Sequence, residues 1–102
     1  MNTVNNREPA LDSKIARDEE LDLLAKAQRN RQLGLWAAGK MGLEGPHVDE
    51  YANAIVKSEA DEDVLRKVAK DLSASGLKVS EGEVMGKMDE FLAIARDQMK
   101  TA

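Results

Sequence analysis

Cysteine is absent from this chain, and proline, histidine and aromatic residues are scarce. Without cysteine the protein forms no disulfide framework and no thiolate zinc site, which is compatible with a reducing cytoplasm. The only histidine, His47, is accompanied by no other residue at metal-ligand spacing. No Ser/His/Asp set or carboxylate pair is spaced for catalysis. We therefore expect no metal site, no catalytic residue and no enzyme activity.

Long apolar runs and an excess of positive charge are also missing. The first residues are polar, unlike a signal peptide, and the longest nearly apolar stretch, residues 33–38, is too short to span a bilayer. The net charge of −4 disfavours non-specific binding to nucleic acid. The sequence therefore predicts no membrane insertion and no nucleic-acid partner.

What remains is a chain that favours helices. Two prolines and 33% charged residues among 102 are typical of a small all-α protein. Because aromatics make up only 3% of the residues, Leu, Ile, Val, Ala and Met must form most of the core. We expect a single domain, a four-helix bundle with short connections.

The first predicted helix begins near Pro9 and runs toward Gly42. Gly34 weakens it by about 1 kcal/mol relative to alanine, which makes this position a candidate for a bend or break. Its second half carries residues that can share a buried face, with Trp36 as the main packing anchor. These residues are Leu21, Leu24, Gln28, Leu35 and Trp36.

Three further helices follow from apolar periodicity and from end signals. The second has apolar residues at Val48, Tyr51, Ala52, Ile55 and Val56. The third starts near a capping Asp61, buries Val64, Leu65, Val68 and Leu72, and stops at Gly76. The fourth opens with a capping box from Ser80 to Glu83 and carries an apolar stripe. That stripe is Val84, Met88, Phe91, Leu92, Ala95 and Met99.

The N-terminal residues have little to bury. Beyond Val4, residues 1–20 offer only Leu11 and Ile15 as sizeable apolar anchors. A segment of this kind is expected to be flexible until it meets a partner. We therefore divide the chain into a flexible segment, residues 1–20, and a bundle domain, residues 21–102.

The stretch GLWAAGKM, residues 34–41, matches a phosphate-binding P-loop up to its last position, where Met41 replaces Ser or Thr. A working P-loop follows a buried strand, and its free backbone amides surround the phosphates. Here the preceding residues and the four between the glycines favour helix, which uses those amides internally. We interpret the small residues instead as a place where another helix approaches closely.

The stretch AQRNRQLGLWAAGKMGL, residues 27–43, resembles the signature of the zeta subunit of alpha-proteobacterial F-type ATP synthases. The similarity extends through Tyr51 and Val56, the Asp61–Val64 segment and the final helix, and so covers nearly the whole chain. The first block is specific, whereas the later pieces are typical of many helices.

This resemblance implies a four-helix bundle that inhibits ATP hydrolysis. In the family, the N-terminal segment is flexible when free and inserts as a helix between catalytic-head subunits and against the rotor. The implied partners are these subunits, and the implied location is cytoplasmic, at the cytoplasmic face of the inner membrane. Candidate partner-binding residues are Val4, Arg7, Glu8, Ala10, Leu11, Lys14, Ile15 and Asp18.

The N-terminal segment departs from the family pattern at several positions. Val4 and Ile15 replace expected aromatics, Asn5 and Asn6 replace acidic residues, and Pro9 interrupts the helix. These departures predict weakened or absent inhibition by this member.

Two alternatives to the inhibitory role stay open. One is a regulatory module that binds ATP or ADP, as the family resemblance also allows, with Arg29, Arg31 and Lys40 as candidate phosphate contacts. No cofactor is required in either case. The other is an adaptor with a different protein partner.

Overall fold

Four helices form the protein in a computed structural model, and no strand occurs in the backbone it describes, residues 2–58 and 60–101. Side chains are described for residues 18–58 and 60–99. The helices are α1 (Asn2–Met41), α2 (Pro46–Val56), α3 (Asp61–Ala74) and α4 (Glu81–Thr101). The predicted all-α four-helix bundle is confirmed.

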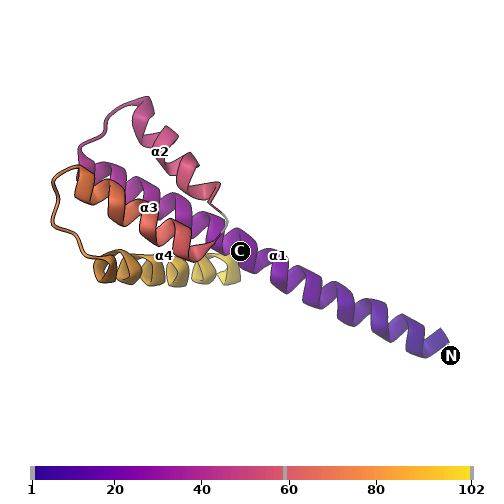
Figure 1. Ribbon diagram of the computed structural model, residues 1–102. Helices are drawn as coiled ribbons and strands as arrows, with labels where there is room; N and C mark the ends of the chain where they lie inside the picture. The colour runs from indigo at the N-terminus through magenta and orange to yellow at the C-terminus, as the bar shows by residue number, and fades with distance from the viewer. Residues whose placement is uncertain (1, 59, 102) are drawn as a thin grey trace.

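Helix α1 is the central element and the longest. Its 40 residues span about 60 Å at 1.5 Å per residue, close to the molecule's longest dimension of 65 Å. The other three helices pack along its second half, and its first half extends beyond them (Figure 1). The chain therefore presents a long helical arm attached to a small bundle.

Two predictions about α1 are wrong. The helix begins at Asn2, not near Pro9, and it continues through Pro9 and Gly34 without a break. An interior proline removes one backbone hydrogen bond, and the helix around it can persist. Helix α1 also crosses the predicted boundary between residues 20 and 21 without interruption. The predicted flexibility of residues 1–20 stays a prediction.

Glycines end two of the helices. Gly42 has φ 76° and Gly76 has φ 83°, in the left-handed region. After α1, Leu43 N–H donates to the Ala38 carbonyl (3.0 Å), and after α3, Leu77 N–H donates to the Leu72 carbonyl (3.2 Å). This is the Schellman arrangement, which satisfies carbonyls left over at a helix end. The predicted stop at Gly76 is confirmed.

The starts of α3 and α4 differ in how they are capped. Ser80 Oγ accepts a hydrogen bond from the Glu83 N–H (3.2 Å), which is one of the two bonds of the predicted capping box. Asp61 does not cap α3, because the N-cap is Ala60 and Asp61 is the first helical residue. The Asp61 carboxylate instead pairs with Arg29 on α1.

The core lies between the second half of α1 and the inner faces of the other helices. Its largest fully buried side chains are Leu33, Ile55, Leu72, Val64, Val68 and Val84. The apolar positions predicted for α2, α3 and α4 are all buried or half-buried. On α1 the residues toward α2 are small, and a Cβ added to Gly34 would lie 2.7 Å from Ala52 Cα. The predicted close helix approach at these small residues is confirmed.

The face of α1 that is buried in the core differs from the predicted one. Leu21, Leu24 and Gln28 are exposed, and Trp36 is only half-buried at the edge of the core. The Nζ atoms of Lys40 and Lys87 lie 6.0 and 5.9 Å from the centre of the Trp36 ring. Aliphatic side chains and Met88 fill the core, and the Trp36 indole packs against its edge.

A polar cluster ties α2 to α3. Tyr51 OH donates to Asp71 Oδ2 (2.8 Å), and Lys67 Nζ lies 3.3 Å from the same oxygen. Burial of the phenol, followed by the hydrogen bond to the Asp71 carboxylate, raises the pKa of Tyr51.

Candidate partner-binding site

The candidate site begins where α1 leaves the bundle. The side chains of Val4, Arg7, Glu8, Ala10, Leu11, Lys14 and Ile15 lie outside the described residues. The remaining predicted contact, Asp18, is exposed on α1 one turn before the bundle begins. Among the described residues, no helix is both long and apolar enough to cross a lipid bilayer.

An ion-pair network fixes the exit of α1 against the last turns of α4. Arg96 Nη2 donates to Asp22 Oδ1 (2.8 Å), and Lys26 Nζ lies 3.6 Å from Asp22 Oδ2. The hydrogen bond from Arg96 lowers the pKa of Asp22, and the positive charges of Lys26 and Arg96 act in the same direction. Asp22 therefore stays ionised well below neutral pH.

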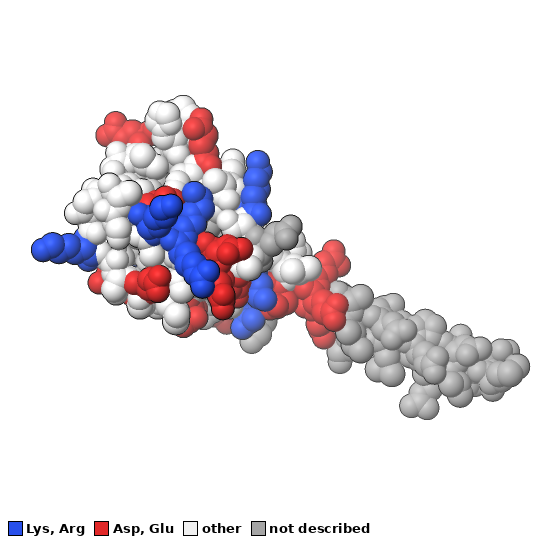
Figure 2. Space-filling model, viewed as in Figure 1, with Lys and Arg blue, Asp and Glu red and all other residues white. Residues whose placement is uncertain are grey.

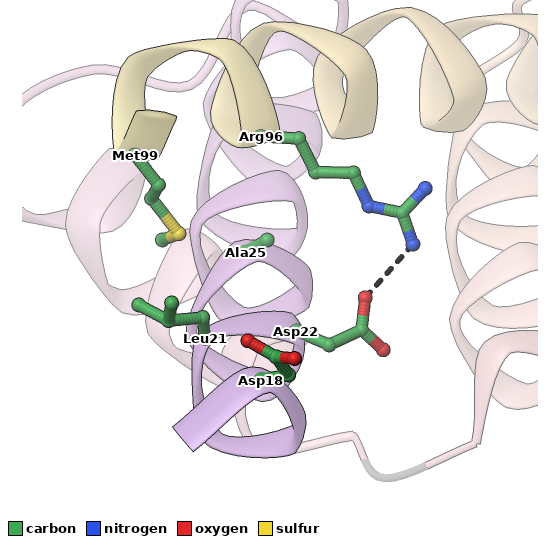
Figure 3. A pocket seen from close by; sticks show the side chains of 6 residues that line it. All are labelled: Asp18, Leu21, Asp22, Ala25, Arg96 and Met99. Carbon is green, nitrogen blue, oxygen red and sulfur yellow. Dashed lines mark hydrogen bonds and ion pairs between the residues drawn. The ribbon is translucent and has the colours of Figure 1, made fainter. Parts of the chain in front are cut away.

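A notch of about 240 Å³ opens beside this network, between α1 and the C-terminal end of α4. Leu21, Ala25 and Met99 supply its apolar lining, and Asp18 lies beside Leu21 and Asp22 (Figure 3). The Asp22–Arg96 pair lies across from Leu21 and Met99 (Figure 3). The notch thus combines an apolar floor with a charged rim.

Acidic side chains gather at the same place. Figure 2 shows them where the described part of α1 leaves the bundle. Asp18, Glu19 and Glu20 are all exposed. Of the residues whose side chains are described, none forms an ion pair with these three acids, while Asp22 is occupied by Arg96 and Lys26. Among the described side chains, the exit of α1 therefore carries unpaired negative charge at Asp18, Glu19 and Glu20.

Sequence reasoning did not assign Asp22, Leu23, Ala25, Arg96 or Met99 to this region. Leu23 is 67% exposed, and Arg96 and Met99 come from the far end of the chain. The stretch LDLL, residues 21–24, was the available signal, because three leucines in a charged segment exceed what one buried helix stripe needs. Nothing in the sequence pairs Arg96 with Asp22.

The three candidate phosphate contacts lie apart. Arg29 is 3% exposed, its Nη2 donates to Asp61 Oδ1 (2.7 Å), and its Nε donates to Asn30 Oδ1 (3.0 Å). The hydrogen bond from Arg29 lowers the pKa of Asp61. Arg29 therefore joins α1 to the start of α3.

Arg31 and Lys40 lie on other parts of α1 than Arg29 and contact different residues. Arg31 lies roughly 200° around α1 from Arg29, where its guanidinium contacts Asp49 (3.5 Å) and Asn53 (3.3 Å) of α2. Lys40 is about 16 Å along the axis from Arg29, beside Trp36. The structure does not bring the three cations together.

The P-loop-like stretch is the C-terminal end of α1 and contains no loop. Its amides belong to the helix, as the sequence reasoning predicted. His47 is exposed and lies 3.6 Å from Glu50. Within the described residues, no cluster of His, Asp and Glu is arranged to hold a metal ion.

Comparison with known proteins adds independent evidence. The model of the family described as ATPase inhibitor subunit zeta matches residues 1–98. One similar solved structure is a solution NMR structure that is 34% identical, with a TM-score of 0.67, and covers 79% of this chain and 96% of its own. A comparison with curated proteins found no match.

The family match includes the arm of α1 as well as the bundle, and the four-helix architecture agrees with what the resemblance implied. The predicted family is therefore confirmed: the chain belongs to the ATPase inhibitor subunit zeta family, the inhibitory regulatory subunits of ATP synthase.

Proposed function

We propose that this chain binds the catalytic head of F-type ATP synthase and restrains ATP hydrolysis through residues 1–20. The observation that carries the proposal is the arm of α1, which extends beyond the bundle in a chain that matches the inhibitor family from residue 1 onward (Figure 1). A helix that projects in this way is free to enter a groove between subunits. Binding there places the chain at the cytoplasmic face of the inner membrane.

The strength of inhibition depends on the departures in this segment. Val4 and Ile15 offer less contact area than the aromatics expected at these positions. Asn5 and Asn6 carry no charge where the pattern has acids. We propose that the native chain inhibits weakly, and that Val4→Phe combined with Pro9→Ala strengthens inhibition.

An ATP hydrolysis assay of the cognate catalytic head tests the proposal. Adding the full chain should lower the rate, and Arg7→Ala with Glu8→Ala should restore it. The matched control is Glu62→Ala with Arg66→Ala, an exposed ion pair on α3 that removes the same two charges. Inhibition that survives removal of residues 1–20 would refute the assignment of the inhibitory element.

Two alternative functions, nucleotide binding and an adaptor role, can be tested separately. ATP or ADP binding by the bundle would appear as amide chemical-shift changes on titration with nucleotide. Lys40→Ala should then change the affinity by no more than a few-fold, because Lys40 lies at a helix end without a phosphate cradle. A pull-down that captures a partner other than ATP synthase would support the adaptor instead.

A further inference from the structure

Three leucines surround α1 where the helix leaves the bundle, and we call Leu21, Leu23 and Leu24 the leucine collar. They keep 42%, 67% and 52% of their surface exposed. At 100° per residue they lie at roughly 0°, 200° and 300° around the helix axis. Leu21 faces α4 at the notch, and Leu23 lies on the far side of α1 near Val56 of α2. All three side chains nevertheless stay at least 42% exposed, and clustered exposed leucines typically mark an interaction surface.

The apolar surface of the collar continues onto α4. Leu21 is also part of the notch, where Ala25 and Met99 extend the apolar area to the last turns of α4 (Figure 3). The Asp22–Arg96 pair holds the two helices together beside it. Leu21 and Leu24 lie about 60° apart around α1, so these two leucines and the notch form one surface built by two helices, and Leu23 extends the collar around α1.

Charge around this surface indicates the chemistry of its partner. Asp18, Glu19 and Glu20 are exposed beside the collar, and no described side chain neutralises them. Apolar groups edged by carboxylates complement an apolar patch edged by lysine and arginine. Nucleic acid and anionic lipid surfaces carry the wrong charge for this edge.

We propose that the leucine collar and the notch dock onto the catalytic head, at a concave apolar surface edged with lysine and arginine. This inference rests on the proposed function, because the same head binds residues 1–20. Leu21 is about 6 Å along the helix axis from residue 17. A head that binds the arm of α1 is therefore close enough to cover the collar, which adds apolar contacts from residues 21–24 and from the notch to those made by residues 1–20.

The test measures binding of the full chain to the cognate catalytic head by biolayer interferometry. Leu21→Ser with Leu24→Ser should weaken binding about tenfold or more, since each loses a buried apolar contact. Met85→Ser is the control for Leu24→Ser, because Met85 and Leu24 are 50% and 52% exposed. The control should stay within about twofold of the native chain, and thermal melting should keep all variants within a few degrees because these side chains add little to the core.

Charge reversal tests the acidic edge. Glu19→Lys with Glu20→Lys should slow association several-fold at low salt and flatten its salt dependence. Glu44→Lys with Asp89→Lys makes the same change in net charge at exposed positions elsewhere, and should leave the association rate within about twofold. Equal effects of the two pairs would overturn the assignment of a basic partner surface.

The outcomes separate this inference from the proposed function. If the native chain does not bind the head, both are overturned. If Arg7→Ala with Glu8→Ala weakens binding but Leu21→Ser with Leu24→Ser does not, only the docking role of the collar is overturned. If sedimentation shows that the native chain is a dimer and that Leu21→Ser with Leu24→Ser abolishes the dimer, the collar and the notch bind a second copy of the chain, and their docking onto the catalytic head is overturned.

Discussion

Gly34→Ala probes the closest contact between two helices of the bundle. The added Cβ would lie 2.7 Å from Ala52 Cα and 3.3 Å from Ala52 Cβ. The first distance is shorter than carbon atoms tolerate, and the nearest atom belongs to the backbone of α2. No side-chain rotation relieves this clash, so α1 and α2 must move apart.

Two opposing effects set the size of the change. Replacing a helical glycine by alanine stabilises the helix by about 1 kcal/mol. Overpacking a close contact costs about 1–3 kcal/mol, and a backbone clash belongs in the upper part of that range. The expected net destabilisation is therefore about 1–2 kcal/mol. For a domain of this size each 1 kcal/mol lowers the melting temperature by roughly 4–8 °C.

Gly39→Ala is the matched control, because it makes the same chemical change in the same helix. A Cβ at Gly39 meets no atom within 4 Å, so this variant should gain up to about 1 kcal/mol. Adding Ala52→Gly to Gly34→Ala should not restore stability, since the Cα clash remains and a glycine inside α2 costs about 1 kcal/mol by itself. Thermal unfolding followed by circular dichroism at 222 nm compares the variants. A Gly34→Ala protein as stable as Gly39→Ala would refute the close packing of α1 on α2.

Three further predictions concern polar contacts. Asp61→Ala should lower the free energy of unfolding, measured in urea, by about 1–3 kcal/mol more than Asp63→Ala does, because it leaves the buried Arg29 guanidinium without its carboxylate. Equal losses in the two variants would show that Asp61 contributes only as a negative charge at the start of α3. Since the folded pKa of Asp61 is lowered, its contribution is present above about pH 4 and is lost as pH falls through the folded value, so Asp61→Asn should flatten the melting temperature between pH 4 and pH 2, measured against the native chain. Tyr51→Phe should lower the free energy of unfolding by about 1 kcal/mol, because it removes the hydrogen bond to Asp71. Absorbance at 295 nm should show that the Tyr51 phenol of the native chain ionises above its ordinary pKa. The free energy of unfolding should fall as pH rises past about 10, where the unfolded phenol ionises first.

Local features of the fold could be predicted because they depend on residues close together in the chain. The spacing of Ala52 and Ile55 places both on the buried face of α2. Ser80 caps α4, and Gly76 ends α3 in the left-handed conformation that glycine adopts without strain. Each of these signals requires only a few neighbouring residues, so the tertiary structure did not need to be known.

The start of α1 could not be predicted by the same means. Local preference predicts Pro9 as the first residue of the helix, yet α1 begins at Asn2 and continues through Pro9. Proline disfavours a helix interior without excluding it, so the signal at Pro9 predicts a boundary that the chain does not use. For the candidate site, low apolar content and the family resemblance were enough to propose residues 1–20, and this assignment stays a prediction.

By itself the sequence determined the four helices, most of their ends and the family, because periodicity, caps and the block at residues 27–43 are written in consecutive residues. Only the tertiary structure decided which face of α1 is buried. Gly34 lets α2 approach α1 closely. Trp36 lies at the edge of the core, and Arg29 is buried and paired with Asp61. The tertiary structure also decided the notch at the exit of α1, since Asp22 and Arg96 are 74 positions apart and meet only when α4 packs against α1. Contacts between distant residues depend on how helices pack, and helix packing depends on shape at many positions at once.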